Sequence, residues 1–156
     1  MKKVSQTLFL LVIGAMMMAA CKTKTTGSQK VASDFLLEIQ HTGCRGNCPA
    51  YNIKVDAKGN ATYNGRRAVE MMGNYKKTLD AKTVEALSQA VIDAHFWDFE
   101  DEYGGEVADI PGVVTIATID GKTKRVNDIR NAPQELKELE AKLEALIGTE
   151  GWEKAE

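Results

Sequence analysis

The stretch from Phe35 to Gly65, FLLEIQHTGCRGNCPAYNIKVDAKGNATYNG, decides the fold. Apolar and polar residues alternate on both sides of the two cysteines, which is typical of half-buried β-strands. The apolar positions are Phe35, Leu37 and Ile39 before the cysteines and Tyr51, Ile53 and Val55 after them. The turn-forming residues 56–60 follow, and Ala61 to Tyr63 begin a return strand. We therefore predict two strands joined by the cysteine segment, followed by a hairpin.

Two further segments have helical periodicity. Asp80 can cap the first helix, whose apolar face would comprise Val84, Leu87, Val91 and Ala94, ending near His95. Pro133 can open the second helix and Gly148 can end it. The apolar stripe of that helix comprises Leu136, Leu139, Leu143, Leu146 and Ile147.

The remaining strand signals lie around these helices. Asn64-Gly65 is a turn signal, and residues 66–72 and 74–78 are expected to continue the sheet. Residues 113–119 and 124–129 flank Asp120-Gly121 as a second hairpin. The order of strands, helix, hairpin and helix predicts an α+β fold: an antiparallel sheet of about five or six strands with two helices packed on one face. We expect a single domain over residues 33–148 and a C-terminal tail over residues 149–156.

Composition narrows the class of protein. The chain has 156 residues, 44% hydrophobic and 27% charged, with a formal net charge of −2. These values suit one globular domain. The slight acidity argues against a nucleic-acid-binding protein, which usually carries a basic patch.

The N-terminus has the features of a secretion signal. Lys2 and Lys3 precede an apolar run over residues 8–20. A helix of that run would be about 20 Å long, shorter than the roughly 30 Å hydrocarbon core of a bilayer. We therefore assign residues 1–20 to a signal peptide.

The signal peptide ends in Met18-Ala19-Ala20-Cys21, which resembles the lipobox of bacterial lipoproteins. The resemblance implies cleavage before Cys21 and acylation of this cysteine, so that the acyl chains anchor the protein to a membrane. Residues 21–32 then form a lipidated, flexible tether. No Asp follows Cys21, which by resemblance to lipoprotein sorting rules predicts an outer-membrane location, facing the periplasm. Loss of Lys2 and Lys3 leaves 18 basic against 22 acidic side chains, a net charge of −4.

Cys44 and Cys48 allow three interpretations. An oxidising compartment favours a disulfide that staples the turn. A redox-active dithiol would use Cys44 as nucleophile and Cys48 as resolving thiol, although such enzymes usually have a two-residue spacer at a helix start. A metal site would add His41, and zinc would need a fourth ligand, for which His95 is the other histidine.

No catalytic motif is found, and we predict no cofactor. The sequence has neither a Gly-x-Ser-x-Gly elbow nor a phosphate-binding loop. Candidate partner-binding residues lie on the cysteine turn and in the aromatic and acidic segment from Phe96 to Asp109. They are Arg45, Tyr51, Trp97, Tyr103 and Asp109.

The chain resembles a family of bacterial envelope domains of unknown function. The resemblance covers residues 33–147 and rests first on Gly43-Cys44-x-Gly46-x-Cys48-Pro49-x-Tyr51. The other shared segments are Thr62-Tyr63-Asn64-Gly65, Phe96-Trp97-x-Phe99, Tyr103 and Asp109-Ile110-Pro111. It implies an envelope setting and a recurring use of the cysteine turn, but no activity.

Together these observations predict an envelope-anchored lipoprotein with a non-catalytic binding or structural domain. Its expected partners are the membrane, through acylated Cys21, and another envelope protein or glycan. A periplasmic thiol-disulfide protein using Cys44 and Cys48 is the first alternative. A metal-binding module is the second.

Overall fold

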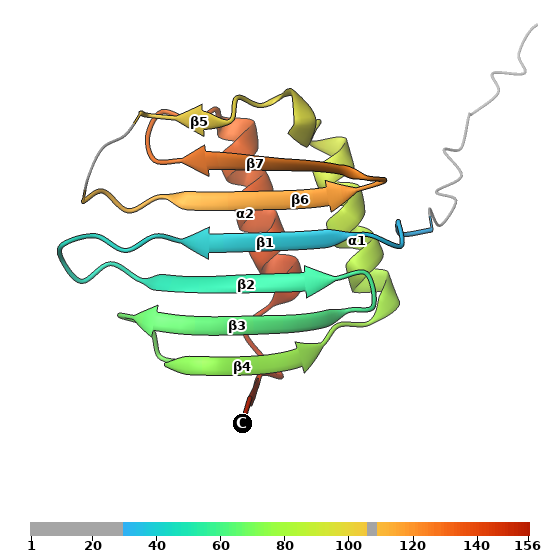
Figure 1. Cartoon of the computed structure of the whole chain (residues 1–156), viewed down its shortest axis with the longest axis horizontal. Helices are drawn as coiled ribbons and strands as arrows, with labels where there is room; N and C mark the ends of the chain where they lie inside the picture. Colours follow the sequence, from blue (N-terminus) through green and yellow to red (C-terminus); the bar gives the residue numbers. More distant parts are fainter. Residues whose placement is uncertain (1–29, 106–108) are drawn as a thin grey trace, which may run out of the picture.

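A computed structural model describes residues 30–105 and 109–156. The predicted signal peptide, Cys21 and most of the predicted tether lie outside the described residues. Within them the chain forms one sheet and two α-helices (Figure 1). The helices are α1 (Ala81–Asp93) and α2 (Gln134–Ile147), with a short 3-10 helix η1 (Phe96–Asp98) after α1.

The strands follow in chain order. They are β1 (Leu36–His41), β2 (Ala50–Asp56), β3 (Asn60–Arg67), β4 (Gly73–Thr78), β5 (Glu102–Tyr103), β6 (Val113–Ile119), β7 (Lys122–Asp128) and β8 (Glu153–Lys154). The spatial order is β5-β7-β6-β1-β2-β3-β4-β8. All neighbours are antiparallel except β5 and β7, which are parallel.

The predicted α+β class is confirmed, but the predicted number of strands is wrong. The sheet has eight strands because β5 and β8, of two residues each, cover its two edges. Strands this short show no alternation in the sequence. They are held by backbone pairing, such as that of Tyr75 with Lys154 and of Glu102 with Asn127.

The predicted turn at Asn64-Gly65 is also wrong, because both residues lie inside β3. Gly65 is needed there for a different reason. A Cβ at this position would lie within 3 Å of the Val69 side chain and would clash with the Met71 carbonyl, because the connection to β4 folds back over it. β3 ends at Arg67, so residues 68–72 do not continue the sheet.

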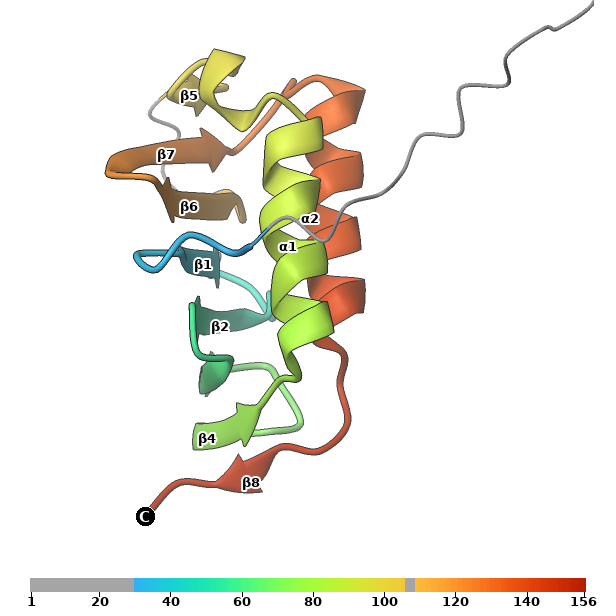
Figure 2. The same cartoon turned by 90° about the vertical axis from the view of Figure 1, so that its right-hand side faces the viewer.

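Both helices lie on one face of the sheet and leave the other face open (Figure 2). Asp80 caps α1 as predicted, since its carboxylate accepts a hydrogen bond from the Thr83 amide at 2.8 Å. The core lies between the layers. It includes Leu37, Ile39, Val55, Leu87, Val91, Leu136 and Leu143.

The antiparallel pairing of β1 and β2 places their connection at one end of the sheet. His41 pairs with Tyr51, and residues 42–49 link the two strands. The described chain begins at Lys30, beside the start of β1, and therefore at the opposite end (Figure 1). Within the described residues, no helix is both long enough and apolar enough to cross a bilayer.

Candidate functional site

The connection between β1 and β2, residues 42–49, is here called the cysteine loop. Cys44 and Cys48 form a disulfide across it, with their Cα atoms 5.5 Å apart. The disulfide interpretation is the one that this structure supports. A closed loop this small would stabilise the fold by about 2 kcal/mol in the chain-entropy view.

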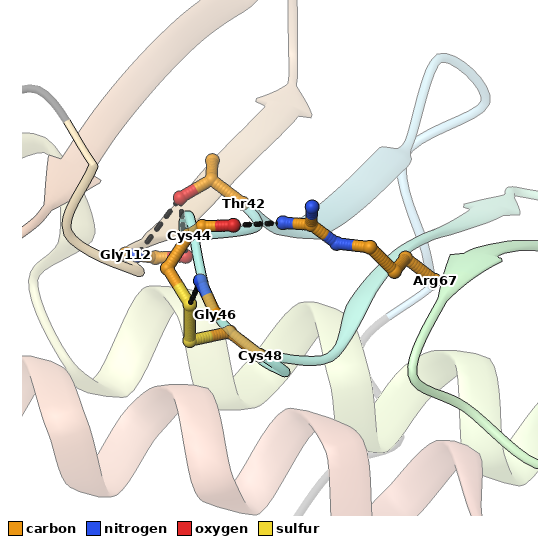
Figure 3. Close-up of a disulfide and its surroundings, with 6 residues drawn as sticks. All are labelled: Thr42, Cys44, Gly46, Cys48, Arg67 and Gly112. Carbon is orange, nitrogen blue, oxygen red and sulfur yellow. Dashed lines mark hydrogen bonds between the residues drawn. A yellow bond between two sulfur atoms is a disulfide. The ribbon is translucent and has the colours of Figure 1, made fainter.

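Thr42 ties the cysteine loop to the segment before β6. Its amide donates to the Gly112 carbonyl at 2.9 Å, and the Gly112 amide donates to Thr42 Oγ1 at 2.8 Å. The Thr42 hydroxyl also donates to the Gly112 carbonyl, at 3.2 Å. Figure 3 shows these bonds beside the disulfide. The loop is therefore held at its first residue as well as through its cysteines.

Arg67, at the end of β3, braces the loop from the other side. Its guanidinium donates to the Cys44 carbonyl (Figure 3). Gly43 leaves room for this side chain, because a Cβ there would lie 2.5 Å from Arg67 Nη2. Arg66 reaches the carbonyl of His41 at 3.4 Å. Two consecutive arginines thus hold the backbone at the start of the loop.

Arg45 projects from the loop into solvent. Its side chain is 86% exposed and pairs with Asp109, which is 43% exposed, at 2.8 Å. An exposed pair of this kind contributes at most about 1 kcal/mol. The structure therefore brings together two of the predicted partner-binding residues, and leaves both accessible.

Beneath the cysteine loop, on the helix-covered face, three side chains form what we call the Glu144 clamp: His41, Tyr51 and Glu144. The rings of His41 and Tyr51 stack with centroids 4.3 Å apart. His41 Nε2 and the Tyr51 hydroxyl both lie 2.7 Å from Glu144 Oε1. Since His41 and Tyr51 flank the loop, this one carboxylate of α2 fixes both of its ends.

The clamp alters the acidity of its members. Burial alone would raise the pKa of Glu144, but the hydrogen bonds from His41 and Tyr51 outweigh it and lower the pKa below its usual range. Burial, together with the hydrogen bond to Glu144, raises the pKa of Tyr51. The charged form of Glu144 and the neutral form of Tyr51 are therefore the stable pair.

Glu140, one helical turn before Glu144, is the most deeply buried carboxyl group of this region, at 7% exposed. It accepts a hydrogen bond from the Thr115 hydroxyl at 3.1 Å. Its pKa is raised to about 7, mainly by burial; the nearby Asp128 and Glu144 act in the same direction, and Thr115 and His41 oppose them. Asp128 is itself only 9% exposed.

A shallow pocket of about 220 Å³ opens beside these groups. His41, Asp128, Arg130 and Lys137 supply its polar lining. The clamp is thus in contact with solvent through His41, on the same side as Gly112. The clamp is a hydrogen-bonded network around the Glu144 carboxylate, and we assign it no reaction.

The other predicted partner-binding residues occupy different positions. Tyr51 lies under the loop rather than on its surface, as part of the clamp. Trp97 and Tyr103 are partly buried against the core near the β5 edge. The Trp97 ring packs edge-on against the buried Phe96, and the Tyr103 hydroxyl accepts a hydrogen bond from the Glu100 amide at 3.0 Å. The structure does not bring these two residues to the cysteine loop.

A metal site at His41, Cys44 and Cys48 would require the disulfide to be reduced, because zinc is bound by thiolates. His41 Nε2 is moreover occupied by Glu144. In the part of the chain that the structure describes, no group of three or more His, Cys, Asp or Glu side chains is arranged to hold a metal ion.

Glu140 and Glu144 were not predicted from the sequence. A usable signal was present at Glu140, which lies inside the apolar stripe of α2, between Leu139 and Leu143. An acidic residue at such a position is either exposed at the edge of the stripe or buried with partners. Its partner Thr115 lies on β6 and is 25 positions away in sequence, so the pairing itself had no local signal.

Comparison with known proteins identifies a family. The sequence profile described as "Domain of unknown function (DUF6438)" matches residues 35–147. No curated protein matches the chain. The matched range begins at Phe35, just before β1, and ends with α2, so it contains both the cysteine loop and the clamp.

Proposed function

We propose that this chain, which belongs to the DUF6438 family of domains of unknown function, is an envelope-anchored lipoprotein with a non-catalytic binding domain. Acylated Cys21 would hold it to the membrane. The cysteine loop would be the surface that contacts another component of the cell envelope. The proposed location is the outer membrane, on the side that faces the periplasm.

The observation that carries this proposal is the bracing of an exposed loop. The disulfide, Thr42, Arg67 and the Glu144 clamp all fix the backbone of the cysteine loop. Yet Arg45, Gly46 and Asn47 at its tip are exposed. A loop fixed before binding loses little conformational entropy when it contacts a partner, which favours affinity.

The position of the loop supports the same role. It lies at the end of the sheet opposite Lys30, where the described chain begins. β1 has six residues between these ends, a length of roughly 20 Å. A tether attached before Lys30 would leave the loop free to face away from the membrane.

Site-specific photocrosslinking in intact cells tests the proposal. A photoreactive residue at Asn47, on the loop, is compared with one at Lys58, an exposed position in the turn between β2 and β3. We expect a discrete crosslinked product from position 47 and none from position 58. Equal products from both positions, or none from position 47, would contradict a binding role for the loop.

One observation favours a second candidate, a thiol-disulfide protein. The Gly46 amide donates a hydrogen bond to Cys44 Sγ at 3.2 Å, at an exposed site. A donor of this kind favours a thiolate at Cys44. In the reaction a substrate dithiol would lose two electrons and two protons and become a disulfide, while Cys44 and Cys48 would become thiols.

The two candidates differ in what the cysteines do. Replacing both with Ala should keep the crosslinks from position 47 if the disulfide is structural. It should abolish oxidation of a model dithiol peptide, without loss of the fold, if the disulfide is a redox centre. Oxidation of the peptide by the unaltered protein at a catalytic rate would favour the second candidate.

A further inference from the structure

We infer that the face formed by Arg45, Arg66, Arg67 and Met72, here called the arginine face, receives an acidic segment of a partner protein, with carboxylates on the guanidinium groups and an apolar side chain against Met72. This inference rests on the proposed function, because it names the class of partner for the same end of the molecule.

The contacts of the cysteine loop gather the three guanidinium groups. Arg67 lies against the Cys44 carbonyl, and Arg66 lies against the His41 carbonyl. Arg45 follows Cys44 directly in the chain. Three cationic groups from one strand, β3, and the cysteine loop therefore lie around residues 41–45.

Their charges are incompletely compensated. Among the described residues, Arg66 and Arg67 form no ion pair with an acidic side chain; each donates to a neutral backbone carbonyl. Arg45 pairs with Asp109 in the open. Glu70, on the connection to β4, is a further acidic residue at this end. Of the other acids at this end, Glu144 is engaged by His41 and Tyr51, and Glu140 and Asp128 are buried, so none of them forms an ion pair with these arginines among the described residues.

Guanidinium groups suit carboxylates in particular. Each carries five N–H donors in a planar fork, so a group that donates once to a backbone carbonyl keeps the others for a ligand. The fork can bind a carboxylate through two parallel hydrogen bonds. The carbonyls of His41 and Cys44 hold two of the forks in place before a ligand arrives, which reduces the entropy lost on binding.

Met72 favours a protein partner over a phosphate group. It is 51% exposed and immediately precedes β4, whose first residue Gly73 pairs with Gly65. Gly65 in turn pairs with Tyr51, two residues after the end of the cysteine loop. An exposed methionine beside arginines has the composition of a protein–protein interface, where both residues are enriched. A phosphate head group would make no use of the thioether.

The test uses the purified mature lipoprotein in nonionic detergent and a fluorescent peptide, Glu-Glu-Leu-Glu-Glu, with Gln-Gln-Leu-Gln-Gln as the uncharged control. Replacing Arg45 and Arg66 together by Glu should weaken binding of the acidic peptide about tenfold or more. Replacing Lys58 and Lys122 together by Glu changes the net charge equally at the opposite end, where both lysines are exposed. That pair should leave binding unchanged.

Two further variants separate recognition from folding and from bulk charge. Arg45→Glu alone touches only the exposed pair with Asp109, so it should fold normally and still weaken binding severalfold. Met72→Ala should weaken binding without changing its dependence on salt. Binding of the acidic peptide by the unaltered protein should fall as ionic strength rises, because the charges are exposed.

Three results of the peptide assay would overturn the inference: equal binding of the two peptides, equal losses for the two double variants, or displacement of the acidic peptide by glycerol phosphate at matched concentration. The last would assign the surface to a phosphate ligand. Crosslinks from Asn47 distinguish a failure of this inference from a failure of the proposed function. If they persist in the Arg45→Glu, Arg66→Glu variant, the binding role stands and the acidic partner is excluded.

Discussion

Cys44 and Cys48 are separated by only 4 positions, so the disulfide closes a small loop and contributes little to the free energy of unfolding. Thr42, Arg67 and the Glu144 clamp hold the same segment without covalent bonds. The disulfide therefore restricts a loop that the rest of the fold already positions. Its loss should loosen the tip around Arg45 more than it unfolds the domain.

Replacing Cys44 and Cys48 by Ala should lower the free energy of unfolding by about 2 kcal/mol. For a domain of this size the melting temperature would fall by roughly 5–10 °C. Thermal unfolding followed by circular dichroism measures the change. Reductant added to the unaltered protein should reproduce it, and a domain that fails to fold without the disulfide would show that the other contacts are insufficient.

The buried carboxyl group of Glu140 makes the stability of the fold depend on pH. Its folded-state pKa of about 7 lies above the ordinary value of 4.5. The unfolded chain therefore releases this proton first as the pH rises, and the folded state loses stability between about pH 4.5 and pH 7. Glu140 therefore destabilises the folded state least at acid pH, where its carboxyl group is protonated.

Replacing Glu140 by Gln should stabilise the protein increasingly from pH 5 to pH 8, by about 1–3 kcal/mol at the upper limit. The amide oxygen can still accept the Thr115 hydrogen bond. Chemical denaturation at several pH values measures the difference. Glu138→Gln, at an exposed position of the same helix, should show no such trend, and a gain at Glu140 that is independent of pH would contradict the assigned pKa.

At the scale of single residues, the sequence predicted the cysteine pairing as one of three possibilities and placed Arg45 on an exposed turn. It could not predict the ion pair of Arg45 with Asp109, because 64 positions separate them and nothing local relates the two loops. The contact of Tyr51 with its partner under the loop could not be predicted for the same reason. Strand alternation placed its ring on the inner face, but its partner Glu144 lies 93 positions away.

Among the elements, the C-terminal segment after α2 depends on one lysine. Lys77 Nζ, on β4, donates to the carbonyls of Ile147, Gly148 and Glu150 at 2.5, 2.8 and 3.1 Å. It also lies 4.4 Å from the centre of the Trp152 ring. A cation at these carbonyls satisfies the unpaired end of α2 and positions β8 against the edge of the sheet.

Replacing Lys77 by Met should destabilise the domain by about 1–2 kcal/mol and release β8 from the edge. Hydrogen exchange should accelerate at Ala155, whose amide donates to the Asn74 carbonyl at 2.9 Å. Lys76→Met is the matched control, because Lys76 is the exposed neighbour on the same strand. Unchanged exchange at Ala155 in the Lys77 variant would contradict the assigned role.

The longer elements were predictable because each combines periodicity with a start or stop signal. α1 begins after Asp80 and α2 ends before Gly148, as expected from their capping residues. β5 and β8 carry no such signal, since two residues cannot show a period. They cover the edges of β7 and β4, which would otherwise expose unpaired backbone groups. Which strands lie at the edges depends on the whole sheet and cannot be seen in the local sequence.

For the whole molecule, the two ends of the sheet have different roles in our account. The end near Lys30 would be the tethered one, and the end with the cysteine loop would contact partners. The anchor was predicted from the sequence. Which end of the domain lies near the tether and which end carries the cysteine loop followed from the direction of β1 in the fold.

Replacing Cys21 by Ser should abolish lipidation. The precursor should keep its signal peptide, and incorporation of labelled palmitate should be lost. Mass spectrometry of the mature N-terminus and membrane fractionation measure both effects, with the Cys44→Ala, Cys48→Ala variant as the control that keeps its acyl chains. A Cys21→Ser protein that is still cut after Ala20 and remains with membranes would contradict the anchor.

The central claim is that the disulfide braces a binding loop and does not exchange with substrates. The most direct test is the redox state of Cys44 and Cys48 in intact envelopes, by thiol trapping and mass spectrometry, together with their reduction potential. Our account predicts full oxidation and a potential below about −300 mV, as in structural disulfides. A mixed population, or a potential near −200 mV or above, would contradict it and identify a redox protein.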